Sequence, residues 1–199
     1  MSRSISNDVK TAWLGALGEI RLGYPFRGGI IGTTGGGARV VQMKDLSRNG
    51  LAPAGEWLET ALPGRSAGHW LADGDILFGA RGTSYGACLV SGPPPNAVAS
   101  QHMYVIRVTR PAHLLPEFLA WQLNQPPAQR YFAQSAEGSR QLSIRRAVLE
   151  AVPLRVPPLS QQQAVVALQR TADAECRVLQ ALIDHRAAEL AAIAERLLA

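Results

Sequence analysis

Cysteine is scarce in this chain of 199 residues, and long apolar runs are missing from it. The two cysteines, Cys88 and Cys176, lie far apart in unlike surroundings, which argues against a disulfide framework and a zinc-binding pair. No run approaches roughly 18 consecutive apolar residues, and residues 1–10 contain no apolar stretch after a basic start. We therefore expect no membrane span, no export signal and a location in the reducing cytoplasm.

Lysine is scarce as well, because 18 of the 20 basic side chains are arginine. The formal net charge of +5 is unevenly spread: residues 1–160 carry +6 and residues 161–199 carry −1. Arginine donates paired hydrogen bonds to phosphate or to guanine, whereas lysine acts as a point charge. The charge therefore favours a nucleic-acid partner for the first 160 residues. Free use of arginine in a high-GC organism would explain the same charge.

Histidine and glycine form no pattern typical of a metal or phosphate site. The histidines at 69, 102, 113 and 185 are scattered and match no ligand spacing, so we expect no metal. The glycine run at residues 28–37 lacks the Gly-Lys-Ser/Thr ending of a phosphate-binding loop. These absences exclude the common motifs of metal and nucleotide chemistry.

One motif is compatible with an enzyme. Residues 82–86 fit the pattern in which a serine, here Ser84, lies on a tight turn between a strand and a helix. The expected strand precedes this turn, but no helix follows it. The acid and the base could come only from a pair such as Glu117 and His185. A small serine hydrolase is therefore kept as an alternative, and we expect no enzyme.

The first half of the chain has the alternation and turn residues of short strands, and the second half has helical spacing. Strands are expected at residues 40–43, 75–79, 88–91 and 103–108. Helices are expected at residues 116–125, 128–136 and 144–150, before an extended segment at 152–158. Pro116 should begin the first helix and Pro126 should end it. The sequence predicts an α+β fold, with a mixed β-sheet and short helices in residues 1–158 and one long helix in residues 159–199.

The long helix has an apolar stripe. Ser160 and Gln163 have capping-box spacing, and no glycine or proline follows them. Such a helix is roughly 60 Å long, too long to lie wholly on its own domain. Its apolar positions recur every three or four residues, as in a coiled coil, and Arg186 is the polar interruption. We call these positions the seam: Leu168, Ala172, Cys176, Leu179, Ile183, Leu190, Ile193 and Leu197. The seam predicts a dimer or a partner helix, and a helix folded back on the domain is the alternative.

Five segments match one family in the same order. Residues 71–82 read Leu-Ala-Asp-Gly-Asp-Ile-Leu-Phe-Gly-Ala-Arg-Gly, and residues 156–163 read Val-Pro-Pro-Leu-Ser-Gln-Gln-Gln. The first resembles the G-D-I-L…R-G element of the specificity (S) subunits of type I restriction-modification systems. The second resembles the family's P-P-L-x-E-Q entry into its long helix, with glutamine in place of the glutamate. Residues 17–20 resemble the opening of the family's domain, residues 40–46 resemble the strand that follows it, and residues 115–119 resemble its central helix.

The resemblance implies a DNA target-recognition domain followed by a spacer helix, in a phage-defence system. A complete S subunit of this family carries two such units, whose helices form an antiparallel coiled coil, so this chain resembles a half-subunit. It implies a homodimer on double-stranded DNA that reads an interrupted palindrome. It also implies a partner methyltransferase that binds S-adenosylmethionine and methylates adenine, and a separate motor nuclease. No cofactor is expected in this chain.

Three loops, at residues 27–39, 81–85 and 138–146, are candidates for DNA contact. Arginines would hold phosphates, and polar side chains would meet base edges in the major groove. Tyr85 stacks on a base or packs inside the domain, and the sequence leaves both open. The candidate DNA-binding residues are Arg27, Thr33, Thr34, Arg39, Lys44, Arg81, Thr83, Tyr85, Ser139, Arg140, Gln141, Ser143, Arg145 and Arg146. A scaffold protein that keeps this fold without reading DNA is a further hypothesis.

Overall fold

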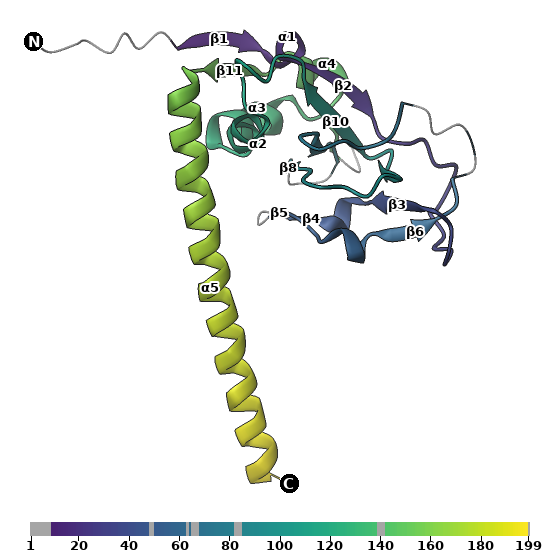
Figure 1. Cartoon of the computed structure of the whole chain (residues 1–199), viewed down its shortest axis with the longest axis vertical. Helices are drawn as coiled ribbons and strands as arrows, with labels where there is room; N and C mark the ends of the chain where they lie inside the picture. The colour runs from purple at the N-terminus through teal and green to yellow at the C-terminus, as the bar shows by residue number, and fades with distance from the viewer. Residues whose placement is uncertain are drawn as a thin grey trace, which may run out of the picture. The chain divides into compact units, whose positions relative to one another are not determined.

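The structure is a computed structural model that describes residues 9–47, 50–62, 64, 68–81, 85–138 and 142–198. It confirms the predicted α+β class: several small sheets and short helices precede one long C-terminal helix (Figure 1). The chain divides into two compact units, residues 1–163 and residues 164–199. The sequence led us to expect the division at residues 158–159.

The central sheet of the first unit has four antiparallel strands. Their order is β2 (Gly18–Leu22), β10 (Met103–Val108), β7 (Ile76–Gly79) and β8 (Ala87–Leu89). Ile106 lies opposite Ile20 on one side and Ile76 on the other. All four residues of β7 are buried, as expected for an apolar strand with neighbours on both edges. The prediction of β10 is confirmed with the same bounds.

A second sheet has the order β6 (Leu58–Thr60), β3 (Ala38–Val41) and β9 (Ala97–Ala99), with β3 and β9 parallel. The short helix η1 (Met43–Asp45) and the pair β4 (Leu46–Ser47) and β5 (Gly50–Leu51) follow β3 along the chain. A second short helix, η2 (Ala54–Glu56), precedes β6. Val41 of this sheet packs in one buried cluster with Leu77 and Val105 of the central sheet. The two sheets therefore share one hydrophobic core.

Three helices follow the sheets: α2 (Pro116–Leu123), α3 (Pro126–Ser135) and α4 (Arg146–Glu150). Pro116 begins α2, as predicted. Pro126 comes after the end of α2 but is also the first residue of α3, so the second helix begins two residues earlier than predicted. The fixed φ of proline suits a first helical position, where the missing N–H costs no hydrogen bond.

The two ends of the first unit are joined by a pair of strands. β1 (Lys10–Trp13) runs antiparallel to β11 (Pro153–Val156), and Figure 1 shows the two side by side. The short helix α1 (Leu14–Leu17) follows β1, and the N–H of Leu14 donates to the carbonyl of Val152 over 3.2 Å. The residues just before the long helix are therefore held by the start of the chain.

The long helix α5 spans Leu159–Leu198 without a break. The carbonyl of Pro158 accepts hydrogen bonds from the N–H groups of Gln161 and Gln162, over 2.9 and 3.2 Å. Ser160 therefore lies inside the first turn, and the predicted capping box at Ser160 and Gln163 is wrong. Within the described residues, no helix is both long and apolar enough to cross a membrane.

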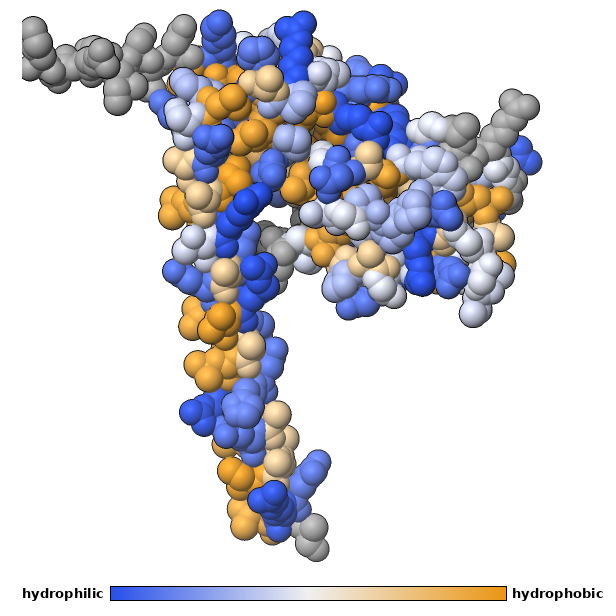
Figure 2. Space-filling model, viewed as in Figure 1, coloured by the Kyte–Doolittle hydropathy of each residue, from blue (hydrophilic) through white to orange (hydrophobic). Residues whose placement is uncertain are grey.

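The seam residues of α5 are largely exposed. Six of them, all leucine or isoleucine, expose between 52% and 78% of their surface; they are Leu168, Leu179, Ile183, Leu190, Ile193 and Leu197. Cys176 is exposed too, and Ala172 is half-buried. Figure 2 shows apolar residues interleaved with charged ones along this helix. An apolar stripe of this length in water is typical of a surface that another helix covers.

Candidate nucleic-acid interface

A buried carboxylate ties together the strands that carry the candidate site. Asp75 is fully buried and accepts hydrogen bonds from Arg107 Nε and Nη2, over 2.7 and 2.8 Å. Its Oδ2 lies 3.4 Å from Arg21 Nη2 and accepts the backbone N–H of Ala72 over 2.9 Å. The bond to Asp75 raises the pKa of Arg107, whereas burial lowers the pKa of Arg21. Asp75 thus fixes the start of β7 against β10 and β2.

The end of β7 is where two of the predicted loops meet. Arg81 forms a backbone bridge with Ser143, and the N–H of Ile144 donates to the carbonyl of Ala80 over 2.9 Å. The backbone N–H and carbonyl of Ser143 also bond to Glu137, which closes the loop on itself. The structure therefore brings Arg81 and Ser143 together, although 62 positions separate them in the sequence. Thr83, Ser139, Arg140 and Gln141, and Ser84 of the hydrolase hypothesis, lie outside the described residues.

The arginines of this region differ in their partners. Arg145 Nη2 lies 2.5 Å from Glu137 Oε2, and Arg146 Nε lies 2.7 Å from Glu150 Oε1. Both pairs are exposed, and exposed ion pairs contribute about 1 kcal/mol or less, so either arginine can exchange its carboxylate for a phosphate at little cost. Arg81 is exposed and has no carboxylate partner in the described part of the chain. We call Arg81, Ser143, Arg145 and Arg146 the arginine cluster.

Tyr85 is packed inside the domain, which decides between the two roles left open by the sequence. Its exposed fraction is 4%, and its ring lies edge-on to Phe132 with the ring centres 6.2 Å apart. Burial raises the pKa of its hydroxyl, which has no hydrogen-bond partner among the described residues. The ring is therefore not an exposed platform for a DNA base, and its inclusion among the DNA-binding candidates is corrected to a packing role.

The predicted glycine loop is held against β6. Thr33 and Thr34 are exposed, but the N–H of Thr33 donates to the carbonyl of Glu59 over 2.8 Å. Gly36 lies so close to the backbone of Thr60 that a Cβ would come within 2.3 Å of its carbonyl carbon. This close approach requires glycine there. Arg27 is exposed at the start of the loop.

Two other candidates lie on the second sheet and beside it. Arg39 is in β3, where its Nη1 donates to the carbonyl of Trp57 over 3.2 Å and its Nη2 lies 3.6 Å from Glu59. These contacts give it a role in joining β3 to β6. Lys44 is exposed in η1, with its Nζ 3.5 Å from the Oδ1 of Asp45.

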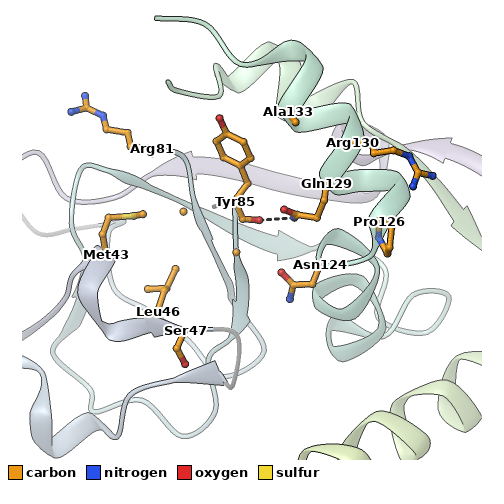
Figure 3. A pocket seen from close by; sticks show the side chains of 12 residues that line it. Met43, Leu46, Ser47, Arg81, Tyr85, Asn124, Pro126, Gln129, Arg130 and Ala133 are labelled. Carbon is orange, nitrogen blue, oxygen red and sulfur yellow. Dashed lines mark hydrogen bonds between the residues drawn. The ribbon is translucent and has the colours of Figure 1, made fainter. Parts of the chain in front are cut away.

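A cavity of about 900 Å³ opens beside the arginine cluster. Figure 3 shows Met43 and Leu46 on one side, Gln129 and Arg130 of α3 on the other, and Tyr85 between them. Arg81 also lines the cavity, and none of its described lining residues is acidic. Sequence reasoning missed Arg130. Arg130 lies in α3, far from β7 in the sequence, and no local motif indicates that residues of both line one cavity.

Metal binding finds no support in the described part of the chain. No group of three or more histidine, cysteine, aspartate or glutamate side chains there is arranged to hold an ion. His69 and His102 are half-buried, and burial lowers the pKa of each, which favours the neutral ring. Cys88 is buried, and its Sγ lies 3.6 Å from the carbonyl oxygen of Ser47.

Comparison with solved structures supports the same fold. An S subunit of a type I restriction-modification system from M. genitalium matches 92% of this chain with a TM-score of 0.62 and 15% identity. The HsdS subunit from Thermoanaerobacter tengcongensis matches 91% with a TM-score of 0.57 and 18% identity. A structure described for assembly and conformational transition of the type I R-M system matches 95%, with a TM-score of 0.61 and 17% identity.

The chain spans less than half of each of these structures: 44%, 41% and 44% of their lengths, in the same order. Among curated proteins no relative is found. A family model, the type I restriction modification DNA specificity domain, matches residues 61–184, which is more than half of the chain. That match includes β7, the arginine cluster and the first part of α5. The chain therefore belongs to the family of type I restriction modification DNA specificity domains.

Proposed function

We propose that this chain is the DNA-specificity half-subunit of a type I-like restriction-modification or related phage-defence complex. The observation that carries the proposal is the arginine cluster, in which Arg81 and Ser143 come from distant segments in a domain of the specificity family. Arginine fits phosphate and guanine with paired hydrogen bonds, and serine donates to or accepts from a base edge. The cluster therefore combines arginines that can bind the phosphates of DNA with a serine that can contact the edge of a base.

The proposed role divides the work among the candidate residues. Arg145 and Arg146 would bind phosphates and fix the register of the domain on the duplex, because their exposed ion pairs exchange readily. Arg81, which lacks a carboxylate partner within the described residues, is free to bind a phosphate or a guanine. Arg27, Thr33 and Thr34 form a second exposed edge for DNA contact.

Pairing through α5 completes the proposed site. Six seam residues expose at least half of their surface, and covering them would stabilise the pair by about 25 cal/mol for each Å² of apolar area. A second copy supplies an identical seam, and the matched S subunits are more than twice as long as this chain. Two copies related by a two-fold axis would place two identical domains on DNA, which favours an interrupted palindrome.

The chemistry is proposed to lie in the partners. In this role the chain itself catalyses no reaction and binds no cofactor. A methyltransferase subunit would bind S-adenosylmethionine and methylate adenine, and a motor nuclease would cut DNA. The complex would act on double-stranded DNA in the cytoplasm.

The test is selection of duplexes from a random library on the purified chain, alone and with the proteins that co-purify from its host. Binding of the selected duplex is then measured against salt concentration. The slope of log K against log salt is negative, and each phosphate contact removed should make it less steep by about 0.9. Arg81→Ala and Arg145→Ala should weaken binding. Arg155→Ala, an exposed arginine of β11, is the matched control and should change little.

Two outcomes would contradict the proposal. If the Arg81→Ala and Arg145→Ala variants keep the affinity and the salt slope of the parent, the arginine cluster is not the interface. If no duplex is enriched with or without partners, the scaffold hypothesis replaces DNA recognition.

A further inference from the structure

Large apolar side chains are exposed at four positions in the described part of residues 1–163: Trp13, Leu22, Ile31 and Leu142. A single exposed apolar residue is common on protein surfaces, so exposure alone indicates nothing. Three of the four, however, lie on or beside the candidate DNA-contact loops. Leu22 is the last residue of β2 before the glycine loop, Ile31 lies in that loop, and Leu142 precedes Ser143 of the arginine cluster. Ile31 is the most exposed of the four, at 79%.

The strand register places the start of the glycine loop at the end of the central sheet where the arginine cluster lies. Leu22 of β2 lies opposite Tyr104 of β10, and Tyr104 lies opposite Phe78 of β7. The glycine loop after β2 and the segment of Arg81 after β7 therefore leave the sheet at the same end, and neighbouring strands are about 5 Å apart. Trp13 comes before β2, so the chain runs from it into the opposite end of that strand.

The backbone on both sides of Ile31 is held in place. The carbonyl of Ile31 accepts a hydrogen bond of 2.7 Å from Oγ1 of the buried Thr60. Two residues later, the N–H of Thr33 donates to the carbonyl of Glu59 over 2.8 Å, and Ile30 packs against a buried cluster of the second sheet. Because a β-branched side chain also has few rotamers, little freedom is lost when the Ile31 side chain contacts a partner.

The surroundings of Ile31 suit the edge of a base. Arg27, Thr33 and Thr34 are exposed in the same loop and can bond to phosphates or base edges. The carboxylate of Glu59 lies 3.6 Å from Nη2 of Arg39, which offsets its charge. The C5-methyl group of thymine is the apolar group on the base edges of the major groove, and apolar side chains contact it there. An exposed isoleucine beside hydroxyl groups therefore matches thymine.

We propose that Ile31 contacts the C5-methyl group of a thymine in the major groove of the recognised DNA, and so helps to determine the recognised sequence. The inference rests on the proposed DNA-specificity function and deepens it, because it assigns one base type to one side chain. It requires a thymine at a fixed position in the duplexes that the chain selects.

The test removes the methyl group from the DNA and the isoleucine from the protein. Each thymine of the selected duplex is replaced in turn by deoxyuridine, which lacks only the C5-methyl group, and binding is measured by competition at one salt concentration. At one position the affinity of the parent chain should fall about fourfold, as expected when one methyl group loses its apolar contact. 5-Bromodeoxyuridine at that position, with a bromine of similar size to the methyl group, should restore the affinity.

Variants of the full chain complete a double-mutant cycle with the DNA change. Ile31→Ala should bind the thymine duplex more weakly and should no longer distinguish thymine from deoxyuridine. Ile31→Val keeps a branched apolar side chain and should retain most of the difference. Trp13→Ala removes an exposed apolar side chain at the other end of β2 and is the matched control, so it should keep the parent affinity and the full loss with deoxyuridine. Circular dichroism should show that all three variants fold.

The proposal is overturned if the selected duplexes share no thymine, if no deoxyuridine weakens binding, or if Ile31→Ala keeps the full difference between thymine and deoxyuridine. In each of these cases a selected duplex still binds, so the proposed DNA-specificity function stands without the Ile31 contact. If no duplex is enriched at all, both proposals fail. The two failures are therefore distinguishable.

Discussion

Gln162 Oε1 accepts a hydrogen bond of 2.9 Å from the backbone N–H of Leu115, 47 residues earlier in the chain. The Nε2 of the same side chain donates to the carbonyls of His113 and Pro157, each over 2.8 Å. Gln162 is fully buried, and it lies within residues 156–163, the segment that resembles P-P-L-x-E-Q. This one amide therefore holds the first turn of α5 to the loop before α2.

The first prediction concerns this amide. Gln162→Glu replaces the NH2 group with an oxygen, which leaves the carbonyls of His113 and Pro157 without a donor and facing a carboxylate. Because an unsatisfied buried polar group costs about 1–3 kcal/mol, the free energy of unfolding should fall by at least that amount. Urea unfolding at neutral pH measures it. Gln163→Glu, at the exposed next position, is the control; an equal loss there would refute the assigned role.

The second prediction concerns the buried carboxylate. Asp75→Asn removes the charge that balances Arg21 and Arg107. Because Arg107 is half-exposed and water can solvate it, the loss should fall below the about 3–5 kcal/mol of a fully buried pair. Thermal and urea unfolding should both show the loss. Asp73→Asn is the control, because an amide oxygen can still accept the 2.8 Å bond from the N–H of Gly92. Full stability of Asp75→Asn would mean that the cluster contributes little.

The third prediction concerns pH. Burial lowers the pKa of His69 and His102 below the ordinary 6.5, and the positive charges of Arg21 and Arg81 lower them further. The unfolded chain therefore binds more protons than the folded chain as pH falls below 6.5, and stability falls with it. Urea midpoints on either side of that pH measure the decline. The double variant His69→Gln/His102→Gln should flatten it, and an unchanged decline in that variant would contradict the assignment.

The fourth prediction concerns the seam. Ile183→Asp places a carboxylate in the proposed helix pair, where its desolvation is costly, so the dimer dissociation constant should rise about 100-fold or more. Sedimentation measures the mass, and circular dichroism should show that the helix remains. Ala188→Asp lies outside the seam on the same helix and is the control. Equal effects of the two substitutions would argue against pairing through these positions.

The fifth prediction concerns the two thiols. Cys176 is exposed on α5, whereas Cys88 is buried and burial raises the pKa of its thiol. A maleimide should therefore label Cys176 quickly and Cys88 only after unfolding. Because Cys176 belongs to the seam, its labelling should slow as protein concentration rises and copies pair. A labelling rate for Cys176 that is independent of concentration would contradict the proposed dimer.

Local patterns in the sequence determined most elements. Strand β10 has the predicted bounds because alternation of apolar and polar residues over 103–108 reflects contacts on both faces of one strand. The long helix follows from the lack of glycine and proline after Pro158 and from its apolar spacing. The family resemblance rested on contiguous motifs, and the family model confirms it. Each of these patterns lies within one continuous segment of the chain, so it can be recognised without knowledge of the tertiary structure.

The tertiary structure alone decided which distant residues meet. Asp75 pairs with Arg21, which lies 54 positions away, and Arg81 lines the same cavity as Arg130, which lies 49 positions away. No local spacing in the sequence relates the two members of either pair. Tyr85 is a buried ring, Arg39 links two strands, and the carbonyl of Pro158, in place of a capping box at Ser160, accepts the first hydrogen bonds of α5. Periodicity in a sequence reports the environment of one element. Which strands pair and which loops come together depends on packing between segments that are distant in the sequence, so no single segment determines it.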